Sequence, residues 1–201
     1  MYNWKTLSPA EREEILKERK ALGFPWHSPP NIKSESRQFH ISAACYRHRP
    51  FIGASIKRME EFSCSLLSTL NENQIMVHAW CVLPNHYHLL VEHPNVKFIA
   101  NSLGRLHGRT SFLWNGEDQQ RGRQVWHRCA DRSMRSENHF WTTMNYVHQN
   151  PVRHGYAEKW QDWPFSSARD FILNEGLNRV KKIWNDYPLY EYGKGWDDPE
   201  F

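Results

Sequence analysis

The sequence predicts an α+β domain in which an antiparallel sheet carries helices on its faces. Two apolar stretches, 75–83 and 87–91, flank a Pro84-Asn85 turn signal and predict a hairpin of two central strands. Elsewhere apolar residues recur at three- and four-residue spacing, which indicates amphipathic helices. Hydrophobic residues make up 39% of the 201 residues, so the chain is long and apolar enough to bury a core.

An N-terminal helix and arm precede the predicted sheet. Ser8 and Glu11 form a capping-box pattern, which predicts the start of a short polar helix. Residues 24–36 contain three prolines, too many for a helix or a central strand. We therefore expect residues 1–36 to be a helix and an arm that wraps on the domain.

The remaining elements follow in order along the chain. Residues 39–46 predict the first strand, and a helix follows with one apolar stripe: Ile56, Met59, Phe62, Leu66, Leu67 and Leu70. A second helix begins after Asn95; we expect Phe98, Ile99, Leu103, Leu106 and Leu113 to face inward, and Asn101, Arg105, His107 and Arg109 to face outward. Residues 124–134 predict another strand. The order β-α-β-β-α-β-α is that of a ferredoxin-like or RRM-like sheet.

Two histidines stand one residue apart in the second hairpin strand. Because side chains alternate between the faces of a strand, His86 and His88 point the same way and Tyr87 points the other way. Two imidazoles on one face are half of a site for a divalent metal. Alone the pattern is weak, because histidines often serve as ordinary hydrogen-bonded polar groups.

A second polar pattern lies on the last helix, which we expect to run from about Glu137 to Pro151. Tyr146 and Asn150 are one helical turn apart and share a face. The residue before a proline disfavours helical geometry, so we expect Asn150 at the helix end. A structural interpretation remains open, in which Tyr146 is a half-buried aromatic residue and Asn150 a helix terminator.

Together these segments resemble the IS200/IS605 transposases, and more closely the REP-associated tyrosine transposases. The family's strand motif is matched by residues 84–91, its Tyr-φ-His-x-Asn-Pro-Val helix motif by 146–152, and its Asp-Trp-Pro-aromatic-Ser-Ser motif by 162–167. Many IS200/IS605 enzymes have glutamine where this chain has Asn150. The REP-associated group commonly has asparagine, so the difference indicates the subgroup.

The resemblance implies a chemistry. His86, His88 and Asn150 would hold Mg²⁺ or Mn²⁺ against the scissile phosphate, and Tyr146 would be the nucleophile that forms a covalent 5′-phosphotyrosine. The implied function is a metal-dependent single-stranded DNA endonuclease and strand transferase acting on hairpin DNA. The resemblance also implies a catalytic domain over residues 37–173 and a tail over residues 174–201. The protein would act as a monomer or a homodimer.

Arginines cluster with tryptophans in the stretch before the last helix. Fork-shaped guanidinium groups suit phosphates, and aromatic rings suit unstacked bases. We expect this set to bind single-stranded or hairpin DNA: Arg105, Arg109, Arg121, Arg123, Arg128 and Arg132. For each arginine a solvated surface charge is an equal alternative. Trp26 and His27 of the arm are more often structural residues than DNA contacts.

Composition agrees with these expectations without deciding between them. The formal charge of +4 is compatible with a polyanionic partner but does not require one. The four cysteines have no Cys-x-x-Cys spacing, so we expect reduced thiols in a cytoplasmic protein. We find no signal-peptide pattern, no stretch long enough to span a membrane, and no phosphate-binding Gly-x-x-x-x-Gly-Lys-Ser/Thr loop for a nucleotide cofactor.

Three other functions remain open. A catalytically silent DNA-binding protein would keep the fold and lose part of the site, yet all four proposed site residues are present. A 2H-type phosphoesterase needs two His-x-Ser/Thr motifs, and only His40-Ile41-Ser42 is found. A zinc hydrolase lacks the His-Glu-x-x-His spacing. We interpret His78 and His148 as structural groups or as neighbours of the ligands.

Overall fold

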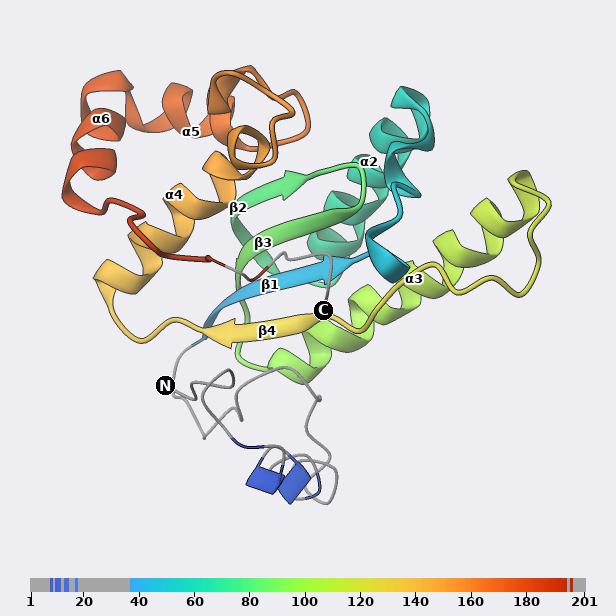
Figure 1. Ribbon diagram of the computed structural model, residues 1–201. Helices are drawn as coiled ribbons and strands as arrows, with labels where there is room; N and C mark the ends of the chain where they lie inside the picture. Colours follow the sequence, from blue (N-terminus) through green and yellow to red (C-terminus); the bar gives the residue numbers. More distant parts are fainter. Residues whose placement is uncertain are drawn as a thin grey trace.

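The chain forms a four-stranded antiparallel sheet with helices on both faces (Figure 1). This computed structural model describes residues 37–194 and 196, together with Ser8, Ala10, Glu11, Glu13, Glu14 and Lys17. The strands are β1 (Gln38–Ala44), β2 (Met76–Val82), β3 (His86–Glu92) and β4 (Ala130–Ser133), in the sheet order β2-β3-β1-β4. The helices are α2 (Ile56–Glu72), α3 (Val96–Glu117), α4 (Glu137–Arg153), α5 (Ala168–Glu175) and α6 (Leu177–Asp186). The predicted α+β class and the order β-α-β-β-α-β-α through α4 are confirmed.

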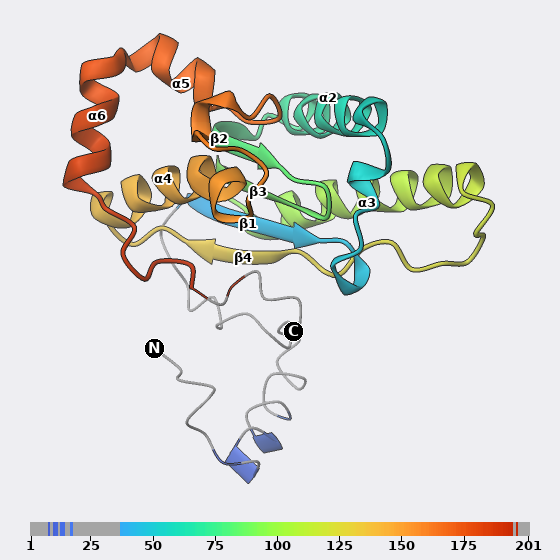
Figure 2. The same ribbon diagram turned by 45° about the horizontal axis from the view of Figure 1, so that its top comes forward.

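The two faces of the sheet bury different helices. Tyr87, Leu89 and Val91 of β3 pack in one core cluster with residues of α2 and α3. Leu90 of the same strand packs in a second cluster with residues of α4, α5 and α6. Figure 2 shows α4, α5 and α6 grouped together, with α2 and α3 grouped apart from them. Strand alternation therefore directs the even-numbered side chains of β3 toward α4.

The strand expected over 124–134 is shorter than predicted. Only Ala130–Ser133 pair with β1, and the preceding segment makes an isolated bridge between Trp126 and Cys45. The Trp126 ring is buried and stacks on His107, with centroids 4.1 Å apart and an interplanar angle of 7°. This segment is therefore held by the packing of the Trp126 side chain in the core and not by regular strand pairing.

The buried face of α3 also differs from the prediction. His107 was expected outside but is buried and hydrogen-bonded to the Tyr87 hydroxyl at 2.9 Å, and burial lowers its pKa to about 4. Phe98 and Leu113, expected inside, are 36% and 51% exposed. Trp114 takes the inward place of Leu113, because the buried stripe follows the face that meets the sheet rather than every apolar residue. Ile56, expected in the stripe of α2, is 65% exposed at the first residue of that helix.

Helix α4 does not end at the proline. It continues to Arg153 with Pro151 inside it, and the backbone N–H of His154 donates to the carbonyl of Asn150 at 3.1 Å. A proline in the last turn removes only one hydrogen bond, and Pro151 is itself buried against the domain. Asn150 therefore lies in regular helix, one turn after Tyr146.

The ends of the chain add to this domain. The capping box at Ser8 is confirmed, because the Ser8 N–H donates to the Glu11 carboxylate at 2.7 Å and the Glu11 N–H donates to the Ser8 hydroxyl at 3.3 Å. The arm with Trp26 and His27 lies outside the described residues. Two helices were not predicted, α5 and α6, and the proposed domain boundary at residue 173 lies within α5. None of the helices in the described ranges is long and apolar enough to cross a membrane.

Candidate functional site

The even-numbered side chains of β3 include both histidines of the predicted half-site. His86 and His88 are 2% and 0% exposed and lie on the face of the sheet that α4 covers. Their rings meet edge to face with centroids 5.0 Å apart. The strand thus places two imidazoles side by side beneath one helix.

Helix α4 supplies the other two predicted site residues. Asn150 Oδ1 lies 3.3 Å from His86 Nε2, and the Tyr146 ring meets the His88 ring edge to face at 5.3 Å. Both helix residues are buried, Asn150 at 0% and Tyr146 at 1% exposure. The four residues predicted as nucleophile and metal ligands therefore converge at one point between sheet and helix.

The remaining nitrogen of each histidine is held by a polar neighbour. His86 Nδ1 lies 2.7 Å from Asn85 Oδ1, and His88 Nδ1 lies 3.1 Å from His40 Nε2. The Asn85 amide nitrogen donates to the carbonyl of His48 at 3.1 Å, so its oxygen is the atom that faces His86. His86 therefore donates its Nδ1–H to Asn85, which leaves the lone pair on Nε2.

This arrangement fits a divalent cation. Metal-bound histidines characteristically donate their second ring N–H to an outer acceptor, as His86 does here. The lone pair of His86 Nε2 faces the acceptor Oδ1 of Asn150. Neither atom carries a proton to donate to the other, and both can bind a cation that lies between them. Within the described ranges no group of three His, Cys, Asp or Glu residues could hold a metal ion, so a third donor would have to be of another kind, such as the amide oxygen of Asn150.

Tyr146 is covered by the chain that follows α6, residues 187–194 and 196, which we call the tail segment. Tyr192 and Trp196 meet the Tyr146 ring edge to face at 5.7 and 5.3 Å. Arg153 of α4 donates to the carbonyls of Tyr192 at 3.1 Å and of Gly193 at 2.8 Å. Figure 1 shows this segment turning back from α6 toward the sheet. Its closure over the Tyr146 ring leaves Tyr146 inaccessible in this conformation.

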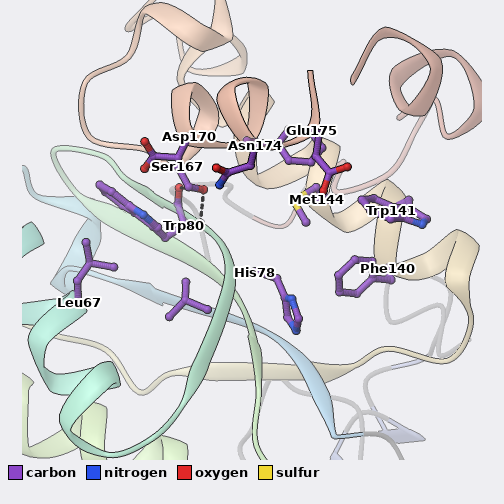
Figure 3. Close-up of a pocket in the computed structure, with 12 residues that line it drawn as sticks. Leu67, His78, Trp80, Phe140, Trp141, Met144, Ser167, Asp170, Asn174 and Glu175 are labelled. Atoms are coloured by element: carbon purple, nitrogen blue, oxygen red, sulfur yellow. Dashed lines mark hydrogen bonds between the residues drawn. The ribbon is translucent and has the colours of Figure 1, made fainter. Parts of the chain in front are cut away.

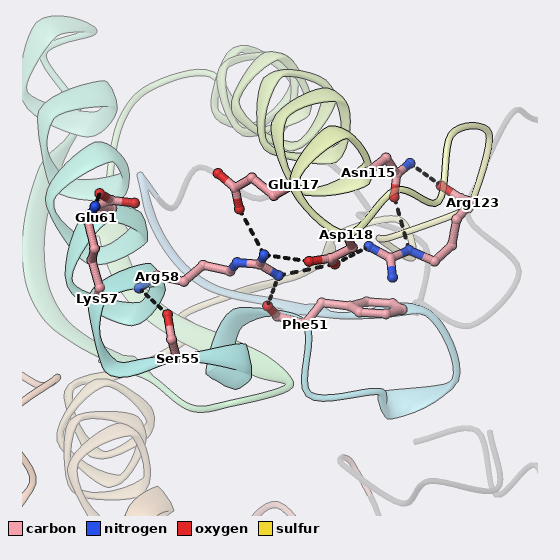
Figure 4. Close-up of polar contacts among 9 residues, drawn as sticks. All are labelled: Phe51, Ser55, Lys57, Arg58, Glu61, Asn115, Glu117, Asp118 and Arg123. Carbon is pink, nitrogen blue, oxygen red and sulfur yellow. Dashed lines mark hydrogen bonds and ion pairs between the residues drawn. The ribbon is translucent and has the colours of Figure 1, made fainter.

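The predicted arginine set is not a single patch. Arg123 pairs with Asp118 at 2.6 Å, and Arg58 contacts the same carboxylate at 2.6 Å (Figure 4). Hydrogen bonds from Arg58, and then from Arg123, hold the pKa of Asp118 at about 2. Arg123 is thus part of an internal ion-pair network.

The other five arginines divide between two regions. Arg105, Arg109, Arg121 and Arg128 are exposed; the first two lie on α3, whose core contacts are on the face away from Tyr146. Arg121 stacks over the ring of Phe112, with its Cζ 4.6 Å from the centroid. Arg132 of β4 lies beside the site, with Cζ 3.3 Å from the Trp196 centroid. Among these five, only Arg132 contacts a residue, Trp196, whose ring packs on Tyr146, as far as the described residues show.

Four further histidines lie outside the predicted ligand set. Two of them, His40 and His154, are neighbours of the predicted ligands that the sequence does not identify, and the other two, His78 and His148, have the structural role that the sequence predicts. The ring of His40, which in the sequence stands out only as part of a His-x-Ser pair, lies beside His88. The ring of His154 lies 4.8 Å from that of His86, between centroids. His148 bonds to the hydroxyl of Ser167 at 2.9 Å, and burial lowers its pKa to about 3. His78 pairs with Glu92 at 3.0 Å. These last two are structural residues.

A separate cavity of about 390 Å³ lies between β2, α4 and α5. Figure 3 shows Trp80, Phe140 and Trp141 at its walls, with Asp170 and Glu175 at one side. None of the predicted site residues lines it. Its two carboxylates make it a poor place for a phosphate backbone.

The chain is similar to known transposases in sequence and in fold. The family model "Transposase IS200 like" matches residues 33–150, a range that contains all four converging residues. A Haemophilus influenzae protein provisionally named a REP-associated tyrosine transposase is 27% identical over 119 residues, covering 54% of this chain and 68% of the relative. A solved structure, of a REP-associated tyrosine transposase bound to a REP hairpin, has a similar fold, with a TM-score of 0.57 at 17% identity over 73% of this chain and 85% of the other.

Proposed function

The chain belongs to the IS200-like transposase family, and from this premise we propose that it nicks and joins single-stranded or hairpin DNA through Tyr146 with the help of a divalent metal. The observation that carries the proposal is the convergence of His86, His88 and Asn150 with Tyr146 between β3 and α4. A tyrosine transposase needs a nucleophile beside a group that can neutralise charge on a phosphate. Tyr146 would supply the first, and a cation held by His86, His88 and Asn150 would supply the second.

Tyr146 would act as the nucleophile in a phosphoryl transfer. Its Oη, after losing its proton, forms a bond to phosphorus as the bond from phosphorus to the 3′ oxygen breaks. The leaving 3′ oxygen takes up a proton, and the 5′ phosphate stays esterified to Tyr146. One phosphoester replaces another, so a second 3′ hydroxyl can reverse the step and join DNA without ATP.

His86, His88 and Asn150 would hold Mg²⁺ or Mn²⁺. When bound there, the cation supplies Lewis-acid stabilisation of the scissile phosphate oxygens. The chain's own contribution is to hold the ligands in place: Asn85 fixes the ring of His86, and regular helix places Asn150 one turn from Tyr146. The positively charged Arg153, with its Cζ 5.7 Å from the Tyr146 ring, adds positive potential near the developing phenolate.

Hairpin DNA is proposed as the substrate because the REP-associated relative of solved structure is bound to a REP hairpin. The exposed Arg105, Arg109, Arg121 and Arg128 are offered as backbone contacts, and Arg132 as a contact beside the site. We do not propose Arg123 as a DNA contact, because its charge is neutralised by Asp118. Either a monomer or a homodimer is compatible with this substrate.

The test is formation of a denaturation-resistant protein–DNA adduct. Labelled hairpin oligonucleotides with single-stranded flanks are incubated with the full chain and Mg²⁺ or Mn²⁺, then resolved on a denaturing gel. We expect an adduct from wild-type protein and none from Tyr146→Phe. Tyr190→Phe is the matched control. Tyr190 belongs to the tail segment, but its side chain is 90% exposed, so loss of its hydroxyl should leave the packing on Tyr146 and the adduct unchanged.

One observation favours a second function, a DNA-binding protein without catalysis. Tyr146 is 1% exposed beneath the tail segment, so DNA cannot reach it until that segment moves. Hairpin binding without an adduct, across both metals and varied flanks, would support this alternative. An adduct that persists in Tyr146→Phe would remove Tyr146 from its assigned role.

A further inference from the structure

His40 is a buried polar residue that the proposed chemistry has not used. It lies in β1 and is 3% exposed. In the pairing of β1 with β3, Ser42 stands opposite His88, so His40 is a diagonal neighbour of His88 on the same face of the sheet. The pairing thus places a third imidazole beside the two predicted ligands.

The contacts of His40 join the ligand to the nucleophile. Its Nε2 lies 3.1 Å from His88 Nδ1, and the two rings stack with centroids 5.2 Å apart. Its ring also meets the Tyr146 ring edge to face at 5.6 Å. One side chain therefore touches both a predicted metal ligand and the predicted nucleophile.

We propose that His40 is a positioning residue of the metal centre, which accepts the Nδ1–H of His88 and so keeps His88 Nε2 available to the cation. The inference rests on the proposed function, because it assigns a role within the same site. A neutral imidazole that binds a cation through Nε2 carries its proton on Nδ1 and must donate it to an acceptor. His40 Nε2 is placed to be that acceptor.

The same logic already holds for His86, whose Nδ1 donates to Asn85. The two ligands are therefore oriented alike, each by a side chain outside the ligand set. His40 comes from β1 and Asn85 from the turn before β3, so the outer contacts also tie two neighbouring elements of the sheet to the site. Loss of such a contact characteristically weakens metal binding by about 10- to 100-fold.

The experiment measures Mn²⁺ binding to the full chain without DNA, from the electron paramagnetic resonance signal of free Mn²⁺. His40→Leu keeps a buried side chain of similar size but has no acceptor. His40→Gln places an amide oxygen near the position of Nε2. We expect the dissociation constant of His40→Leu to rise by about 10- to 100-fold, and His40→Gln to recover most of the loss.

His78→Leu is the matched control. His78 is also a strand histidine that bonds to a side chain of the neighbouring strand, Glu92, but it has no described contact with the site. Its Mn²⁺ affinity should equal that of wild type. Thermal unfolding of all variants identifies any change in affinity that follows from a folding defect.

The outcomes separate this inference from the proposed function. Wild-type affinity in a folded His40→Leu variant, or equal losses in the leucine and glutamine variants, would overturn the acceptor role and leave the Tyr146 adduct assay untouched. Failure of wild-type protein to bind Mn²⁺ would overturn the metal centre, and the role of His40 with it. A normal adduct from His40→Leu only at raised Mn²⁺ concentration supports both.

Discussion

Gly193→Ala tests whether the tail segment controls access to Tyr146. Gly193 has a φ of +76°, and a Cβ built on it would collide with three carbons of the Tyr146 ring. A left-handed backbone costs alanine roughly 1–2 kcal/mol, before the collision is counted. This alone lowers the ratio of docked to undocked tail by about 5- to 30-fold. We therefore expect the initial rate of adduct formation to rise by up to about this factor.

The assay pairs adduct kinetics with limited proteolysis of the tail segment, which reports undocking independently. Gly176→Ala is the control, because Gly176 also has a positive φ, +78°, but an added Cβ would meet no atom within 4 Å. It carries a comparable backbone cost at the junction of α5 and α6, outside the tail segment, so its rate should stay at the wild-type value. A Gly193→Ala tail that is undocked by proteolysis while the rate is unchanged or lower would refute the reasoning.

Three further predictions concern charge and the third ligand. The pKa of Asp118 is about 2 instead of its ordinary 3.8 because of Arg58 and Arg123. This lowering corresponds to roughly 2 kcal/mol of folding stability, which solvent screening reduces to about 1 kcal/mol. Since the folded-state pKa is lowered, this stability is present above about pH 4 and lost toward pH 2. The free energy of unfolding in urea should therefore be lower for Asp118→Asn than for wild type at about pH 4, and the difference should shrink toward pH 2. A difference that does not change with pH would contradict the ion-pair explanation. Arg109→Ala should reduce the salt slope of hairpin binding by about 1, whereas Arg123→Ala should lower stability and leave the slope unchanged; the opposite pattern would return Arg123 to the DNA contacts. Asn150→Ala should abolish the adduct while metal-free hairpin binding, measured by fluorescence anisotropy, stays at the wild-type level; a surviving adduct would exclude Asn150 as a ligand.

Most of the candidate site could be predicted from the periodicity of single strands and helices. Alternation in β3 predicted that His86 and His88 share a face, and the four-residue spacing in α4 predicted that Tyr146 and Asn150 share another. Both patterns are properties of a single element, so they can be derived before any packing is known. That the two faces meet required the sheet and helix to pack, which the structure provides.

Features that depend on distant pairs were not predictable in the same way. His40 lies beside His88 because β1 pairs with β3, a register that no local pattern states. The sequence pattern predicts Arg123 as a DNA contact, whereas its pairing with Asp118 is seen only in the folded chain. His107 reads as a surface residue on its helix, yet the Tyr87 hydroxyl and the Trp126 ring hold it in the core. Long-range contacts decide all three.

The central claim is that Tyr146 forms the covalent bond to DNA, and peptide mapping tests it most directly. After reaction with a hairpin oligonucleotide and Mn²⁺, the adduct is digested with nuclease and protease and analysed by mass spectrometry. We expect a phosphonucleotide on the peptide that contains Tyr146, with the modification absent from His86→Ala. A phosphonucleotide on any other residue, or a modification of Tyr146 that survives in His86→Ala, would contradict the account.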